Sequence, residues 1–519
     1  MRVVKFAVAA AAALLSTAAS AEWFEARTNH FIIYSESNRA DTIAFAERLE
    51  RFDNALRVLQ RMPTSQAEPD VAKVVVYRFG DTHDIGTLAG SDGVAGFYIP
   101  RAAYPVAFTP AKDYHMAGSL GRTDERIELK PGTVLFHEYT HHFMLRNFPA
   151  TYPGWYVEGF AEVNSTIELR PDGSFLVGKP ANHRSIELFE MQQLHVRKLL
   201  DPNYKYTSIE EVVQKYSMGW LLSHYLTFDK PRAGQLATYL KLLGEGKPGL
   251  AAAEQAFGDL NKLNSELQKY KSTNMPAIEV RPAAYAPPTV SIRLVDPSEE
   301  RFMRQRIQLA RGVTRSDARR INAALGHASA EDPKNFLLQL LAAEAGLDAL
   351  DFATASAAAD RALALAPNSV DALIFKARTL IEAKDGPADR FAQARKLLVQ
   401  ARSIDKADPR PLIEYYMSYR RAGQRPIPEV AIFALEDAYD LAKHDRYYRL
   451  ILTRQLLEEN RAAPAAQVLA PLAFSFDGRD PEKNYAGKAM TAVQAGDVPG
   501  ALAILAKELD KLESLTDDS

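Results

Sequence analysis

A His-Glu-x-x-His motif at residues 137–141 has a spacing that can hold a metal ion. On a helix, side chains four residues apart project from one face, one turn above the other, so His137 and His141 can bind the same ion. Glu138 lies about 100° round the helix, where its carboxylate can reach a water beside that ion without binding the ion itself. The motif therefore predicts a metal site with an adjacent general base.

The residues that flank the motif are apolar. Segments 133–136 and 143–145 read Thr-Val-Leu-Phe and Phe-Met-Leu, and they predict a buried helix. A glutamate in such a helix is costly unless it has a function or a partner. A functional Glu138 is therefore favoured. The alternative is a core helix in which hydrogen bonds satisfy the two histidines and the glutamate.

A catalytic zinc site takes three protein ligands and leaves one position open. The chain contains no cysteine, so only histidine and carboxylate ligands are available. Glu158, on the next predicted helix, supplies a carboxylate, and Glu162 lies one turn further on the same face. A carboxylate at position 162 could accept a hydrogen bond from a ligand imidazole and so select its tautomer. The alternative for Glu162 is an ordinary surface or salt-bridged residue.

The two motifs together resemble the gluzincins, zinc metallopeptidases of the peptidase-MA-like group. The residues that carry the resemblance are His137-Glu138-x-x-His141 and Trp155-x-x-Glu158-Gly159-x-Ala161. The resemblance covers about residues 22–275 and implies Zn2+ as the cofactor, with the ligands His137, His141 and Glu158. It also implies Glu138 as the general base. Thermolysin-like relatives carry an acidic residue four positions after the ligand glutamate, which is the place of Glu162.

A second segment, Tyr216-x-x-Gly219, is similar to one in the aminopeptidase-N branch of this group. There a tyrosine hydrogen-bonds the tetrahedral intermediate, so the resemblance implies Tyr216 as an oxyanion donor. The alternative is an aromatic ring packed at the start of a helix, and His224 is a weaker candidate for the same site. The glycine-methionine-glutamate-asparagine signature of aminopeptidases is absent, and Val157 replaces that branch's asparagine. An endopeptidase is therefore favoured over an exopeptidase.

The sequence upstream of the motif predicts the scaffold that positions it. Residues 30–34 and 71–79 predict strands and residues 41–62 predict a long helix, which together indicate a mixed sheet with covering helices. Residues 93–100 and 103–109 predict a hairpin. Its first strand could form the lip of the cleft and bind an extended peptide through its free edge. The alternative is an internal hairpin with no role in substrate binding.

Residues 1–21 predict a secretory signal peptide. Arg2 and Lys5 precede an apolar run, and residues 19–21 form a small-residue cleavage site. No run in the chain predicts a transmembrane helix, and an exported chain without cysteine suits the bacterial periplasm. We therefore expect a periplasmic or secreted protein. Because Lys+Arg 63 nearly balances Asp+Glu 65, we expect no nucleic-acid partner.

The last part of the chain changes in composition. Residues 271–300 are rich in proline and predict a linker, or a small β connection, between two domains. Residues 301–519 predict Ala- and Leu-rich helices, in which Pro333 and Pro367 recur at about the 34-residue period of tetratricopeptide repeats. Such a solenoid would present a concave face to a peptide or protein partner. A packing role for these helices is the alternative.

These observations predict an exported zinc metallopeptidase. Its fold is expected to be an α+β gluzincin-like catalytic domain over residues 22–270, followed by an all-α tetratricopeptide-like solenoid. The expected reaction is hydrolysis of a peptide bond by a zinc-activated water, with Glu138 as the general base. Two alternatives stay open. One is a catalytically silent periplasmic scaffold that binds protein partners through the helical repeats, and the other is a zinc amidase that acts on peptidoglycan.

Overall fold

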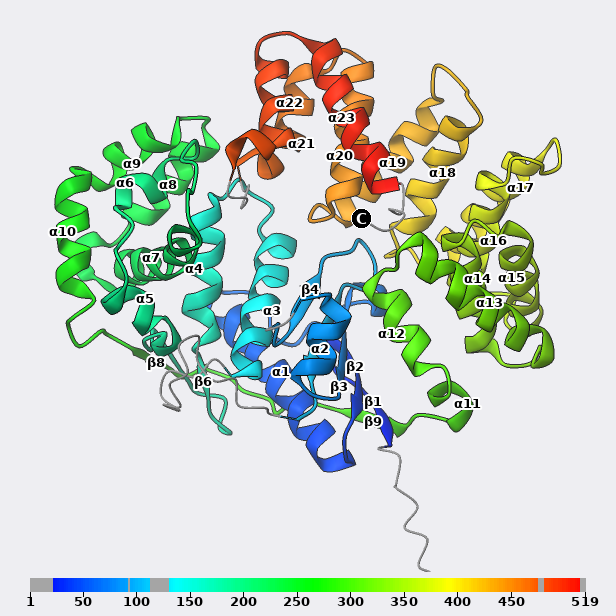
Figure 1. The fold of residues 1–519 in the computed structure, drawn as a ribbon, viewed down its shortest axis with the longest axis horizontal. Coiled ribbons are helices and arrows are strands. Elements are labelled where there is room, and N and C mark those ends of the chain that lie inside the picture. Colours follow the sequence, from blue (N-terminus) through cyan, green and yellow to red (C-terminus); the bar gives the residue numbers. More distant parts are fainter. Residues whose placement is uncertain (1–21, 92–93, 113–129, 475–479, 514–519) are drawn as a thin grey trace, which may run out of the picture.

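The computed structural model describes residues 22–519, except 92–93, 113–129, 475–479 and 514–519 (Figure 1). The predicted signal peptide lies outside the described residues. Three parts follow one another along the chain: a mixed sheet with its covering helices, a helical lobe and a long series of helices (Figure 1).

A six-stranded sheet organises the first part, with the strand order β4-β5-β3-β2-β1-β9. Its strands are β1 (Trp23–Arg27), β2 (Phe31–Glu36), β3 (Val74–Phe79), β4 (Phe97–Ile99), β5 (Val106–Pro110) and β9 (Ser291–Leu294). β2, β3 and β5 are parallel and the other pairs are antiparallel, so the predicted mixed sheet is confirmed. The hairpin predicted over residues 93–109 is the β4–β5 pair, and β4 is one edge of this sheet.

Helices cover both faces of this sheet: α1 (Arg39–Leu59), α2 (Thr82–Ala89), α3 (Pro131–Asn147) and α12 (Met303–Arg311). α1 and α3 share a core with one face, where the rings of Phe52 and Phe136 stack with centroids 3.8 Å apart. α2 and α12 cover the other face through Ile85 and Ile307. Burial of both faces explains why β2 and β3 are apolar along most of their length. The apolar side of α3, the helix with the metal motif, is thus anchored on the sheet.

A helical lobe follows. It contains α4 (Gly154–Ser165), η2 (Asn182–Arg184), α5 (Ser185–Glu190), α6 (Val196–Leu200), α7 (Ile209–Phe228), η3 (Lys230–Arg232), α8 (Gln235–Gly244), α9 (Gly249–Phe257) and α10 (Leu260–Tyr270). The apolar pattern of residues 186–200 predicts one helix, but the structure divides it into α5 and α6. The second helix starts where the ring of His195 accepts a hydrogen bond from the N–H of Arg197 at 3.1 Å, which caps α6.

The proline-rich segment 271–300 carries two strands. β8 (Ile278–Val280) pairs with the hairpin of β6 (Glu168–Leu169) and β7 (Phe175–Val177), and β9 pairs with β1 at the second edge of the large sheet. The short helix α11 (Pro297–Glu300) follows β9. The segment is therefore a β connection, the second of the two possibilities that its sequence leaves open.

The remaining helices, α13 to α23, pack each against the next, and we call them the helical array. They are α13 (Arg315–Glu331), α14 (Phe336–Asp348), α15 (Phe352–Leu365), α16 (Val370–Glu382), α17 (Arg390–Ile404), α18 (Arg410–Arg421), α19 (Glu429–Leu441), α20 (Arg446–Glu458), α21 (Ala462–Phe474), α22 (Tyr485–Gln494) and α23 (Val498–Glu513). The array curves, and its last helices return toward the first part of the chain (Figure 1). The predicted all-α region is confirmed. Within the described ranges, no helix has the length and apolar character needed to cross a membrane.

α4 and α7 cross at two glycines. A Cβ at Gly159 would lie 2.2 Å from Ser223 Oγ and 2.4 Å from Gly219 O, and a Cβ at Gly219 would lie 2.8 Å from Trp155 O. Real Cβ atoms do not approach other atoms so closely, so the crossing requires glycine at both positions. Because Glu158 directly precedes Gly159, this crossing also sets where Glu158 stands.

We expect Gly159→Ala to lower the free energy of unfolding by about 2 kcal/mol, because the added methyl group forces two packed helices apart. Gly244→Ala is the matched control, since Gly244 ends α8 and a Cβ there would meet no atom within 4 Å. Urea unfolding of the metal-free proteins measures both changes. Equal stabilities for Gly159→Ala and the parent would contradict the close crossing.

Acidic side chains lie together on α14 of the helical array. Burial raises the pKa of Glu344 to about 7, and the charge of Asp348, one turn further on, raises it as well. Arg101 of the first part of the chain lowers this pKa, whereas Asp371 on α16 raises it. The ionised form of Glu344 is therefore disfavoured in the folded protein.

This shift makes stability depend on pH. The folded-state pKa of Glu344 lies above the ordinary 4.5, so ionisation of Glu344 lowers the stability of the folded protein. This loss of stability is small below pH 4.5 and is complete above about pH 7. We expect Glu344→Gln to raise the free energy of unfolding by about 2 kcal/mol at pH 8 and by much less at pH 5. Urea unfolding at both values tests this, with the exposed Glu331→Gln as control. A gain that is larger at pH 5 would contradict the assignment.

Candidate metal centre

The three predicted ligands come together where α3 packs against α4. His137 Nε2 lies 3.0 Å from His141 Nε2 and 3.2 Å from Glu158 Oε2. His141 Nε2 lies 3.5 Å from Glu158 Oε2. A tetrahedral zinc ion with bonds of about 2.0–2.1 Å places its ligand atoms about 3.4 Å apart. The three donor atoms therefore fit such an ion in both chemical type and separation.

The start of each helix determines which side chains reach the site. Pro131 occupies the first turn of α3, where a missing N–H costs nothing, and the histidines follow in the middle of the helix. α4 begins at Gly154, directly after Pro153, so Glu158 stands in its second turn. Glu158 is 8% exposed and His137 and His141 are partly buried. The donors therefore meet in a mostly desolvated place that solvent still reaches.

Glu158 is held in its anionic form. Burial raises its pKa, but the charge of His141 and hydrogen bonds from both histidines outweigh burial, and the net pKa lies well below the ordinary 4.5. An ionised carboxylate beside two imidazole nitrogens is a donor set that suits Zn2+.

Glu162 lies one turn beyond Glu158, and its Oε1 is 3.7 Å from His137 Nδ1. It is 2% exposed and accepts hydrogen bonds from His183 Nε2 at 3.0 Å and Arg184 Nε at 2.9 Å. Burial raises the pKa of Glu162, but the charge of Arg184 and the bond from His183 lower it further, well below its ordinary value. Glu162 is thus a salt-bridged residue that lies beside the His137 imidazole, beyond hydrogen-bond distance of its Nδ1. Its role in orienting that imidazole stays a prediction.

Glu138 and Tyr216 are the two residues predicted to act on substrate. Burial raises the pKa of Glu138; the charges of His141 and His137 lower it, and the net pKa is raised. Tyr216 lies on α7 beside the residues that hold Glu162, since Arg184 Cζ is 5.5 Å from the centre of its ring. The role of Tyr216 as an oxyanion donor stays a prediction.

His224, the weaker candidate, is fully buried away from the ligands. Its Nδ1 lies 2.9 Å from Tyr270 Oη and its Nε2 lies 2.8 Å from Gly178 O. Both ring nitrogens therefore have partners in the core of the helical lobe, and His224 is a structural residue.

A second group of buried ionisable side chains holds α3 from another side. His30 Nδ1 lies 2.7 Å from Glu50 Oε1 and 3.1 Å from Asp53 Oδ2. Arg57 Nε donates to Asp53 Oδ2 at 2.6 Å, and Tyr139 Oη donates to Asp53 Oδ1 at 2.6 Å. His30, Glu50 and Asp53 are close enough to hold an ion, but Arg57 and Tyr139 already use both oxygens of Asp53. Because Tyr139 lies between the ligand histidines, this network anchors the helix that presents them.

Sequence reasoning missed Arg184 and Asp53. A buried carboxylate needs a cation or several donors, so an inward Glu162 signals that a partner exists. The sequence does not show which of the many arginines it is, because the partner comes from a turn beyond a hairpin. Asp53 lies in a predicted helix, but its contacts with His30 and Tyr139 depend on how three elements pack.

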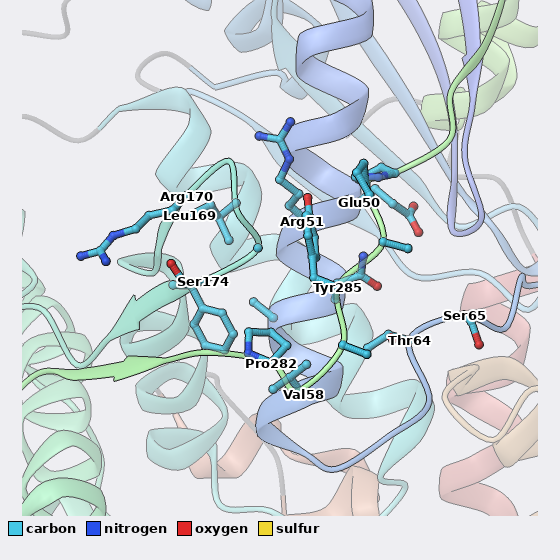
Figure 2. A pocket seen from close by; sticks show the side chains of 18 of the residues that line it. Glu50, Arg51, Val58, Thr64, Ser65, Leu169, Arg170, Ser174, Pro282 and Tyr285 are labelled. Carbon is cyan, nitrogen blue, oxygen red and sulfur yellow. The ribbon is translucent and has the colours of Figure 1, made fainter.

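Among the described residues, we consider two cavities, and none of the three ligands lines either of them. One, of about 180 Å³, lies between α1, the β6–β7 hairpin and segment 282–289, where Tyr285 faces α1 (Figure 2). The other, of about 580 Å³, separates the start of α4 from α22 of the helical array, with Trp155 and Met490 in its walls. This second cavity opens one turn before Glu158.

Comparisons with family models, with curated proteins and with solved structures find no match to this chain.

We expect Glu162→Gln to weaken zinc binding by about 10- to 100-fold, because a neutral amide orients and polarises the His137 imidazole less than a carboxylate does. Glu168→Gln, at an exposed position on β6, is the control. Competition with a chromophoric chelator measures the affinity of each protein for Zn2+, and circular dichroism reports the fold. A folded Glu162→Gln protein with the parent's affinity would contradict this role.

Proposed function

We propose that this chain is an exported zinc-dependent peptidase of the gluzincin type that cleaves within peptide chains. One observation carries the proposal: the donor atoms of His137, His141 and Glu158 lie 3.0 to 3.5 Å apart, at the separation of ligands round one zinc ion. Glu138 is adjacent in sequence to one of these ligands. Export to the periplasm or outside the cell is proposed from the signal-peptide pattern of residues 1–21.

Each residue of the site has a separate role in the proposed hydrolysis. When bound, zinc supplies a Lewis acid that polarises the scissile carbonyl and activates a water. Glu138 accepts the proton of the attacking water and passes it to the leaving amine. Tyr216 donates a hydrogen bond to the oxygen that becomes negative. Glu162, held by Arg184 and His183, orients the imidazole of His137.

The position of β4 supports a peptide as the substrate. β4 is an edge strand and packs against α3, the helix that carries Glu138. Its Tyr98 Oη lies 2.7 Å from Nδ1 of His142, the residue after a ligand. An extended peptide that paired with this edge would run beside the metal centre, with backbone hydrogen bonds to supply affinity.

The proposal is tested by cleavage of a mixed peptide library with zinc-loaded mature protein, read by mass spectrometry. We expect about one zinc ion per chain in the parent and in Glu138→Gln. We also expect cuts by the parent that Glu138→Gln makes at least about 1,000-fold more slowly, because only the general base is lost. Glu168→Gln is the matched carboxylate control and should cleave like the parent.

Two outcomes would contradict the proposal. One is a parent protein that binds no zinc after incubation with Zn2+, and the other is equal cleavage by the parent and Glu138→Gln. If zinc binds but no peptide is cut, purified peptidoglycan is the next substrate, since an amidase would use the same attack on a different amide. No product from either substrate, with zinc in place, would favour the silent scaffold.

A further inference from the structure

The loop that follows edge strand β4 contacts the helical array. Residues 101–104, which we call the 101–104 loop, connect β4 to β5. The backbone O of Arg101 accepts a hydrogen bond from His444 Nε2 at 3.0 Å. The backbone N–H of Ala102 lies close enough to the carboxyl of Asp445 to lower the pKa of that group. His444 and Asp445 stand directly before α20. Two adjacent side chains of the array therefore face two adjacent backbone groups of the loop, and His444 is hydrogen-bonded to the loop.

Burial lowers the pKa of His444 to about 4, so its ring is neutral at physiological pH. A carbonyl oxygen only accepts, which means that the proton of this neutral ring lies on Nε2 and points at Arg101 O. The same ring lies near α3, with its centroid 6.2 Å from that of His142. One residue of the array therefore contacts both the 101–104 loop and the helix of the metal motif.

The side chains of the loop make further contacts with the array. Tyr104 lies under the guanidinium of Arg410, with Cζ 5.1 Å from the ring centre, and Arg410 is itself paired with Asp371 at 2.7 Å. Ala103 packs in a small apolar cluster that includes Ala407, just before α18. Tyr104 has a positive φ of 50°, a conformation that a tyrosine keeps only where surrounding contacts stabilise it.

Arg101 and Ala102 complete the contact. The guanidinium of Arg101 donates to Ala310 O of α12, outside the array, at 2.5 Å, and it lies near the acidic Glu344 and Asp348 of α14. Ala102 packs against the apolar core of the last six helices. The four loop residues therefore contact the array from α14 to α20, on the side that faces the sheet.

We infer that the helical array is a clamp on the 101–104 loop, and that through this loop it positions edge strand β4 for an extended peptide substrate. The inference rests on the proposed function, since it assigns substrate binding to β4. It differs from the partner-binding role expected of a solenoid, because this part of the array surface is occupied by the chain's own loop. β4 has only three residues and, among the described residues, a single neighbouring strand, so the contacts of the loop add to the restraint that α3 supplies through the bond between Tyr98 and His142.

Hydrogen exchange tests the clamp without any need for catalysis. We expect His444→Ala to speed exchange of the backbone amides of residues 97–104 by about 10-fold or more, since local opening no longer breaks the bond to Arg101 O. His444→Gln, which keeps an N–H donor, should restore part of the protection. Arg461→Ala is the matched control, because it removes an exposed ion pair with Glu436 elsewhere in the array. Tyr104→Ala, a change on the loop side, replaces His444→Ala if that protein does not fold.

Steady-state kinetics test whether the clamp affects binding of an extended peptide substrate. We expect His444→Ala to raise KM for an extended peptide several-fold while kcat changes less than about 2-fold and zinc content stays the same, because binding is altered and the catalytic groups are not. Unchanged exchange at residues 97–104 in a folded His444→Ala protein overturns the clamp. Faster exchange with an unchanged KM overturns the positioning of substrate. If His444→Ala speeds hydrogen exchange at residues 97–104 but the parent protein cleaves no peptide, the clamp is supported and the proposed function is contradicted.

Discussion

The packing of α4 between α3 and α7 is the contact on which the candidate site depends. On one side α4 brings Glu158 to within 3.5 Å of both imidazole nitrogens of α3. On the other side Gly159 allows α7 to approach so closely that a methyl group would not fit. A shift of α4 by about one ångström would change both separations that involve Glu158, so the metal geometry is a property of helix packing as much as of the ligands.

Buried charges hold these helices in their relative positions. Glu162 joins α4 to η2 through His183 and Arg184, and Asp53 joins α1 to α3 through Tyr139. Both carboxylates are buried, so each depends on its partners, and loss of one partner leaves an uncompensated charge in a low dielectric. Such networks specify one arrangement of the helices, which a metal site requires and an apolar contact alone would not ensure.

The helical array belongs to the same physical system. The array begins after the chain has added β9 to the large sheet and covered one face with α12. Its later helices then contact the loop beyond β4 through His444. Among the described residues, β4 and β9 are the two edge strands of this sheet. The array therefore contacts the loop that follows one of these edge strands.

The sequence by itself determined what depends on short-range periodicity: the histidines one turn apart, Glu158 on the following helix, the mixed sheet with its β4–β5 hairpin, and the all-α region. These are set by which residues repeat every two or every 3.6 positions. Only the tertiary structure decided the remaining contacts. Arg184 is the partner of Glu162, and Asp53 is the partner of Tyr139. β9 joins the large sheet, and His444 bonds the 101–104 loop. Each of these joins residues whose separation in sequence carries no pattern, because a buried polar group requires a partner but its local sequence does not specify which one packing will supply.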